Sequence, residues 1–294
     1  MVDVTKIEKL LKKHFDIRGT ASVDANTGIV DVQGEVILKD KFKLTRLPVQ
    51  FGHVTGGFTC WKNTLTTLEG APHTARDFIC ESNQLTSLEH APKRVSGSFR
   101  CGRNQLTSLA HVPKGVISFE CPSNLLTSLE GAPSQVTGTF NCANNKLTSL
   151  EHCPTSVGYE FNCSGNQLTS LMHGPQDVGS AGGPFGGHYL CAYNHLTNLE
   201  GAPAYVPGNF VCHANPLKTL EGMPALIGKV FTVGWSDMLP MLRMLDKNVT
   251  RMQLVDGPPQ VVQILLKHAQ QGKAGAIKAA AELSKEGFRG NARW

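Results

Sequence analysis

Apolar and polar residues follow one pattern through most of the chain, and the pattern recurs every 20 or 21 residues. Apolar positions alternate first, as at Val136, Phe140 and Cys142, and a period of two predicts a short β-strand. Two leucines follow at five and eight residues past the cysteine, and a proline stands at twelve. The unit reads V-x-G-x-F-x-C-x-x-N-x-L-T-S-L-E-G-A-P. One strand per unit predicts coils that stack with their strands in a parallel sheet.

Six positions of the unit stay in phase through eight copies. The shared cysteines are Cys60, Cys80, Cys101, Cys121, Cys142, Cys163, Cys191 and Cys212. An aromatic residue stands two positions before each cysteine, and an asparagine stands three positions after it. We therefore predict a repeat solenoid, a parallel β stack of eight to nine coils of ~21 residues. Aromatic and cysteine side chains should form inward ladders, and the asparagines should pair backbone groups where each strand ends.

The two ends of the chain depart from the repeat and predict caps. Residues 1–50 predict an N-terminal helix plus a β-hairpin with a Thr27-Gly28 turn, and residues 51–233 hold the solenoid. Residues 234–294 predict a C-terminal helical cap.

Three helices are predicted within this C-terminal part. The first is capped by Ser236 and carries Met238, Leu239, Leu242 and Leu245. The second follows Pro258 and Pro259, and the third is the alanine-rich stretch 273–285, which ends at Gly287.

The string F-x-C-x-x-N-x-L resembles the L-x-L-x-x-N-x-L centre of leucine-rich repeats, with Phe and Cys in two leucine places. The longer string N-x-L-T-S-L-E-G-A-P resembles leucine-rich-repeat-like proteins of tailed bacteriophages. The resemblance covers residues 1–233. It implies the fold and a phage-encoded protein, found in the host cytoplasm, or in the virion if the protein is structural. It implies little about activity.

The nine cysteines and eleven histidines raise the question of a metal site. Zinc sites usually draw on C-x₂-C or H-x₃-H pairs, and the sequence has none of these. Thiols in evenly spaced rungs should form a reduced, buried row. Return-loop histidines such as His90, His111, His152 and His173 share one register and should be solvated. We expect no catalytic residue, no metal and no cofactor.

Charge is unevenly placed along the chain. Its formal net value is +5, and residues 51–233 carry ten Lys or Arg against eleven Asp or Glu. A long basic groove for nucleic acid is therefore not expected, although the basic C-terminal tail leaves that alternative open. The first fifteen residues lack a secretory leader pattern, and no apolar run approaches a membrane span.

The candidate binding site lies where the repeat is interrupted. The interval from Cys163 to Cys191 is 28 residues, because a glycine-rich insertion occupies 179–187. Outward strand positions nearby are apolar or histidine, whereas most others are polar. The predicted protein-binding residues are Phe185, His188, Leu190, Val211 and His213.

Two functions from different classes follow. The first is a non-enzymatic scaffold that binds a host or phage protein through the open sheet face and the insertion. The second is a structural, virion-associated component of a phage particle. An enzyme, or a nucleic-acid-binding protein acting through the basic tail, is the remaining alternative.

Overall fold

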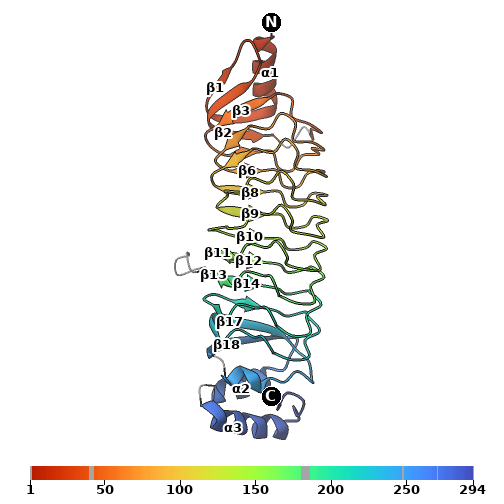
Figure 1. Cartoon of the computed structure of the whole chain (residues 1–294), viewed down its shortest axis with the longest axis vertical. Coiled ribbons are helices and arrows are strands. Elements are labelled where there is room, and N and C mark those ends of the chain that lie inside the picture. The colour runs from red at the N-terminus through yellow and green to blue at the C-terminus, as the bar shows by residue number, and fades with distance from the viewer. Residues whose placement is uncertain (1, 40–42, 180–185, 247, 270, 294) are drawn as a thin grey trace. The chain divides into compact units, whose positions relative to one another are not determined.

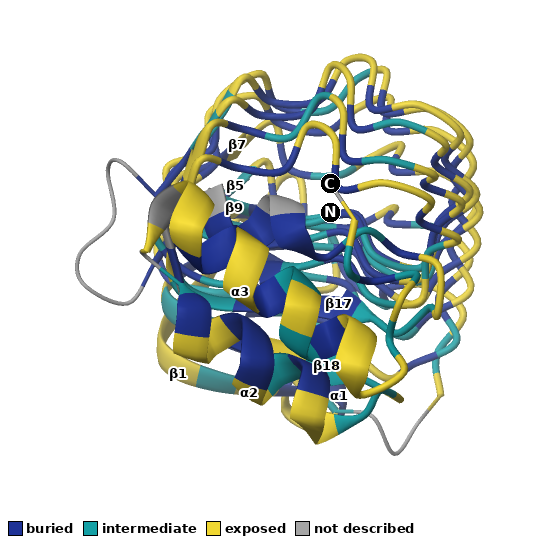
Figure 2. Ribbon diagram, turned by 90° about the horizontal axis from the view of Figure 1, so that it is seen from below, coloured by how far each residue is buried: buried dark blue, intermediate teal, exposed yellow. Residues whose placement is uncertain are grey.

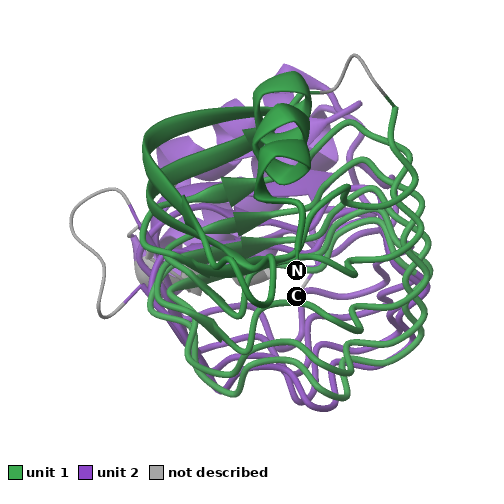
Figure 3. Cartoon of the chain, turned by 90° about the horizontal axis from the view of Figure 1, so that it is seen from above, with its two compact units in different colours: residues 1–145 green, residues 146–294 purple. Residues whose placement is uncertain are grey.

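The computed structural model describes residues 2–39, 43–179, 186–246, 248–269 and 271–293. The chain forms two compact units, Met1–Asn145 and Lys146–Trp294, which Figure 3 shows in different colours. Each unit is a parallel β-solenoid built from the repeat, and the elements of both are labelled in Figure 1.

Unit 1 begins with the predicted helix and hairpin. Helix α1 (Val4–His14) leads directly into β1 (Phe15–Val23), which pairs antiparallel with β2 (Val30–Leu38). Asp3 caps α1, since its side chain accepts a hydrogen bond from the Lys6 amide at 2.9 Å. Gly28 has a φ of 74° in the hairpin turn, a conformation that glycine adopts without strain.

The remaining strands of unit 1 come from the coils, and each coil supplies one or two short strands. They are β3 (Phe51–Val54), β4 (Phe58–Thr59), β5 (Thr74–Ala75), β6 (Phe78–Ile79), β7 (Arg94–Val95), β8 (Ser98–Arg100), β9 (Ser118–Glu120) and β10 (Phe140–Asn141). Strands β2, β4, β6, β8, β9 and β10 pair in that order, in parallel. Strands β3, β5 and β7 form a second parallel ladder.

Unit 2 continues the same repeat. Its strands are β11 (Ser156–Val157), β12 (Glu160–Asn162), β13 (Asp177–Val178), β14 (His188–Leu190), β15 (Tyr205–Val206), β16 (Phe210–Val211), β17 (Leu226–Gly234) and β18 (Asn248–Val255). Strands β12, β14, β16, β17 and β18 pair in order, all in parallel. Strand β11 pairs with β13, and β15 with β17.

Within each unit the strand register places like residues on like residues, as predicted. Phe78, Phe99 and Phe119 stand directly opposite one another, with ring centroids 5.5 Å and 6.0 Å apart. Every ladder aromatic and every ladder cysteine is fully buried. Fully burying such side chains is worth roughly 1.5–3 kcal/mol each before entropy is counted. The inward ladders therefore form the core of each unit.

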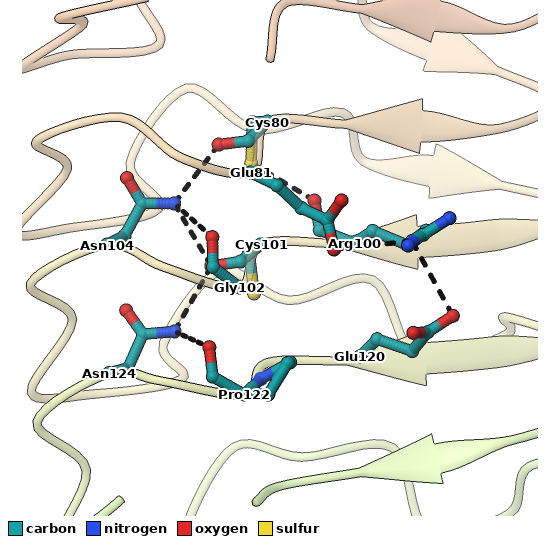
Figure 4. Close-up of polar contacts among 9 residues, drawn as sticks. All are labelled: Cys80, Glu81, Arg100, Cys101, Gly102, Asn104, Glu120, Pro122 and Asn124. Atoms are coloured by element: carbon teal, nitrogen blue, oxygen red, sulfur yellow. Dashed lines mark hydrogen bonds and ion pairs between the residues drawn. The ribbon is translucent and has the colours of Figure 1, made fainter. Parts of the chain in front are cut away.

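Asparagines tie successive coils together, as Figure 4 shows. The Asn104 side-chain amide donates to the carbonyl of Cys101 in its own coil and to that of Cys80 in the preceding coil, each at 3.0 Å. Its Oδ1 accepts from the backbone amide of Leu85, also at 3.0 Å. The sequence predicted that the asparagines would pair backbone groups. The structure adds that each one serves two coils.

The C-terminal end differs from the sequence expectation in one element. The predicted helix that begins at Ser236 is instead a turn followed by a 3₁₀ helix, η2 (Leu242–Asp246), and then by strand β18. Strand β18 pairs along β17 and continues the sheet by one more strand. The sequence did not predict this strand, because buried Val249 and Met252 do not follow a period of two.

The last two helices lie where the sequence placed them. They are α2 (Pro259–His268) and α3 (Gly272–Lys285), and Gly287 beyond α3 has a φ of 91°. Helix α2 packs on β18, while both helices contact η2 and each other. Figure 2 shows their buried and exposed faces. The boundaries 1–50, 51–233 and 234–294 remain a prediction for separate domains.

Candidate functional site

Four of the five predicted binding residues lie together in unit 2. His188 and Leu190 belong to β14, Val211 belongs to β16, and His213 follows β16 closely. Strands β14 and β16 pair with Leu190 opposite Val211, so these two apolar side chains are neighbours on one sheet face. All four side chains are half-buried.

The fifth residue, Phe185, lies outside the described residues, as do residues 180–184 of the insertion. The described ends of the insertion come close together. A Cβ atom on Gly179 would collide with the Cα atom of Gly187, and both glycines have positive φ values, 92° and 82°. The chain therefore leaves β13 and re-enters β14 at one place, which keeps the coil register intact across the insertion.

Two exposed tyrosines border the predicted residues. The Tyr159 ring packs edge-on against His188 with centroids 6.1 Å apart, and the Tyr193 ring does the same with His213 at 5.1 Å. Tyr159 is 43% exposed and Tyr193 is 63% exposed. We call Tyr159, His188, Leu190, Val211, Tyr193 and His213 the tyrosine-flanked patch.

The sequence reasoning missed both tyrosines. Neither stands at an outward position of the strand pattern, because Tyr159 precedes β12 and Tyr193 lies in the turn after β14. The available signal was that the aromatic ladder uses one tyrosine, Tyr189, so the chain's other tyrosines had to lie elsewhere.

His188 also has a structural role that the sequence did not reveal. Its Nδ1 accepts a hydrogen bond from the backbone amide of Asn209 at 3.1 Å. Asp77 does the same for the Ser98 amide at 2.9 Å, and Ser118 for the Thr139 amide at 3.1 Å. Residues at this register, three before the cysteine, pair the next coil's backbone.

Glu160 stands opposite His188 on the neighbouring strand β12. Burial raises the pKa of Glu160, and the charge that His188 can carry opposes this rise. This carboxyl group is an acceptor for a cationic or hydrogen-bonding group beside the patch.

The sheet face of unit 1 has a different chemistry. Arg100 on β8 lies between Glu81 and Glu120, with its Nε 3.3 Å and 3.6 Å from their carboxylate oxygens (Figure 4). Further along the same face, Arg76 contacts Asp77 at 2.8 Å and Glu35 at 3.8 Å. Opposite charges from neighbouring coils therefore lie beside each other on this sheet face. The sequence identified these positions as outward but not as a connected charge network.

The cysteine ladder does not provide reactive groups at neutral pH. Burial raises the pKa of the Cys60 and Cys142 thiols to about 12, and it also raises that of Cys101 well above the usual value. All nine cysteines are buried. Among the described residues, no group of three or more His, Cys, Asp or Glu side chains is arranged to hold a metal ion.

No helix in the described part of the chain has the length and apolar character needed to cross a bilayer.

Comparison with known proteins gives a likeness to several solved structures. No family model matches the chain, and no curated protein matches it. The functional domain of InlJ from Listeria monocytogenes, which includes a cysteine ladder, is 19% identical with a TM-score of 0.46. That match covers 76% of this chain and 53% of the other, so the chain spans about half the length of that structure.

The second similar structure is YopM from Yersinia enterocolitica WA-314. It is 15% identical with a TM-score of 0.25, and the match covers 76% of this chain and 71% of that one. Both similar structures are leucine-rich-repeat proteins. In this chain the repeat is seen directly in the coils, whose strands pair in parallel with like residues opposite one another.

Proposed function

We propose that the chain is a non-enzymatic scaffold that binds another protein through the tyrosine-flanked patch of unit 2. The observation that carries the proposal is the packing of exposed Tyr159 and Tyr193 against His188 and His213, beside adjacent Leu190 and Val211. Tyrosine and apolar side chains concentrate binding energy at protein interfaces, because they bury a large area at little cost in conformational entropy.

The rigidity of the coils supports this proposal. The strands beneath the patch are fixed by buried Tyr189 and Phe210 and by the Asn194 amide, which bonds the carbonyls of Cys163 and Cys191 at 3.1 Å and 3.2 Å. A surface that is already ordered loses little entropy when a partner binds. The outward side chains can therefore vary without loss of the ladder that positions them.

The test compares two substitutions at one register of the repeat. Leu190 in the patch and Ile79 in unit 1 are both half-buried residues directly before a ladder cysteine. Leu190→Glu should abolish capture of a partner from lysate of the source cells, at a cost of about 2 kcal/mol or more in binding free energy. Ile79→Glu should leave capture intact. Both variants should retain the circular dichroism spectrum of the unmodified chain.

Capture that is equal for the unmodified chain and for Leu190→Glu would contradict the patch. If Leu190→Glu does not fold, Tyr193→Ser replaces it in the capture experiment. Tyr193 is mostly exposed, so this substitution should leave folding intact. Turnover of a substrate that a single Ser, His or Cys substitution abolishes would contradict the non-enzymatic role.

We also propose a bacteriophage origin, on the resemblance of the N-x-L-T-S-L-E-G-A-P string alone. In this proposal the protein acts in the cytoplasm of the infected host. Mass spectrometry of purified particles checks the alternative. A stoichiometric amount of the chain in particles would make it a virion component. Its absence from particles would favour the protein-binding scaffold.

A further inference from the structure

A groove in unit 1, far from the tyrosine-flanked patch in sequence, gathers basic side chains. It has a volume of about 590 Å³ and is lined by Ile29, Gln50, Gly70, Ala71, His73, His90, Ala91, Lys93 and His111. The lining residues that the structure describes include three histidines and one lysine but no carboxylate. Such a concave, cationic surface is complementary to an anion.

The repeat explains why these side chains meet. His90 and His111 stand ten residues past their ladder cysteines, in successive coils, while His73 and Lys93 stand thirteen past theirs. Two registers of one solenoid thus form two rows, and the small side chains of Ala71 and Ala91 lie between them in sequence. Lys114 extends the second row by one coil, and its ammonium group donates to the Gly131 carbonyl at 2.7 Å.

The charge is confined to a few coils. The residues thirteen past the ladder cysteine are His73, Lys93 and Lys114 in three successive coils of unit 1. In the five later coils they are Ser134, Thr155, Gln176, Ala204 and Ala225, none of which carries a charge. The fold therefore does not require a basic residue at this register.

The backbone conformation also indicates that the histidines are present for the chemistry of their imidazole rings. The residue ten past the ladder cysteine has a positive φ in every coil. The φ is 67° at His90 and 71° at His111, and two of the neighbouring coils have glycine there, Gly70 and Gly131. Glycine adopts this conformation most easily, and Asn, Asp and His also tolerate it. The chain uses only glycine or histidine there, so the imidazole is present where the backbone alone would favour glycine.

We infer that this groove binds a multiply charged phosphate-type oxyanion, with Lys93 and the imidazoles of His73, His90 and His111 as hydrogen-bond donors. The inference is independent of the proposed protein-binding function. Lysine binds phosphate as a point charge, and a protonated imidazole donates from both nitrogens. Binding therefore strengthens in mildly acidic solution, where imidazoles gain a proton.

Neighbouring charged groups modify this pH dependence. Glu89 lies 4.0 Å from His90 and opposes the anion, whereas Arg94, Lys114 and His53 add to the positive side. The His53 ring lies 6.3 Å from that of His73.

The experiment is calorimetric titration of the full chain with sodium tripolyphosphate at fixed ionic strength, at about pH 5.5 and about pH 8. We expect saturable binding that is tighter at the lower pH. The double substitution His90→Gly with His111→Gly should weaken it at least about tenfold, and so should Lys93→Ser. Glycine and serine are what other coils carry at these registers, so both variants should fold.

The repeat also offers a matched control. His152→Gly with His173→Gly changes the same register in unit 2, where Thr155 and Gln176 replace the basic row. This control should bind tripolyphosphate like the unmodified chain. Absence of saturable binding, or an equal loss in the control and in the unit 1 variants, would overturn the inference.

Discussion

Single residues in left-handed conformation explain two features of the repeat. The residue two past each ladder cysteine has positive φ in every coil, from 53° at Lys62 to 69° at Gly165. Residues ten past the cysteine do the same, and each of them is glycine or histidine. Each coil thus turns at two fixed points, and glycine is the residue that adopts these conformations with least strain.

At the same scale, the aromatic ladder can be tested by truncating one ring. Phe119 is fully buried between Phe99 and Phe140, with ring centroids 6.0 Å and 5.7 Å away. Phe119→Ala should lower the free energy of unfolding by about 3–5 kcal/mol, because it leaves a cavity that rigid neighbours cannot fill. Urea denaturation measures the change. Ile117→Ala, at a residue that is 50% exposed, is the control and should cost little.

The asparagine ladder predicts a loss of similar size from a small polar side chain. Asn104→Ala removes the buried donor bonds to the carbonyls of Cys80, Cys101 and Gly102 and leaves the Leu85 amide without its acceptor. Each buried group left unpaired costs roughly 1–3 kcal/mol, so the total should reach about 3 kcal/mol. Thermal denaturation of Asn104→Ala beside that of Gln105→Ala, which changes an exposed neighbour, measures the difference. Equal melting temperatures would contradict the double pairing.

At the scale of elements, the strands and the flanking helices were largely predictable, and the exceptions have physical causes. Period-two alternation located the coil strands, and Pro259 and Gly287 marked the last two helices. Met238, Leu239, Leu242 and Leu245 fit a helical period, but they form a turn and the 3₁₀ helix η2. Strand β18 was not predicted, because it forms by pairing along β17, and the sequence alone does not show that pairing.

The cysteine ladder makes the strands sensitive to alkali. The folded pKa of Cys60 is raised to about 12 from an ordinary value of 9.0, so the unfolded chain loses the thiol proton first. The stability contributed by this burial is complete below about pH 9 and falls as the pH rises from 9 towards 12. Each such thiol should contribute a slope of up to about 1.4 kcal/mol per pH unit.

Denaturation in urea at a series of pH values measures that slope. The Cys60→Ala variant should show a shallower decline above about pH 9 than the unmodified chain, even if it is less stable throughout. Identical slopes would mean that the Cys60 thiol ionises equally in the folded and unfolded chain.

At the scale of the whole molecule, the constant spacing of the repeated residues was enough to predict the solenoid. The sequence predicted only part of the candidate site. Leu190 and Val211 were located because outward strand positions follow from alternation. Tyr159 and Tyr193 were not, since their rings reach the histidines from a loop and a turn. The groove at His73, His90 and His111 was also missed, because it depends on how two registers face each other across coils.

The repeat predicts that one whole coil of unit 1 can be removed. Deletion of residues 102–121 joins Cys101 to Pro122 and preserves the C-x-x-N spacing to Asn124. The shortened chain should fold cooperatively, because each coil contacts mainly its neighbours. Deletion of residues 102–111 breaks the phase of the leucines and should prevent cooperative folding. Calorimetric unfolding of both chains distinguishes these outcomes.

The asparagine rungs have a direction, which matters while the chain is being synthesised. The side-chain oxygens of Asn83, Asn104 and Asn124 accept hydrogen bonds from the backbone amides of Leu65, Leu85 and Leu106 in the preceding coils. Each coil therefore needs the coil that follows it to pair one of its backbone donors. Ribosomes release the N-terminal coils first, and a newly emerged coil therefore exposes a backbone donor until about one further coil has left the exit tunnel. Folding during translation should accordingly trail synthesis by one coil. A nascent chain halted inside the repeat therefore ends in a coil with one unpaired backbone amide.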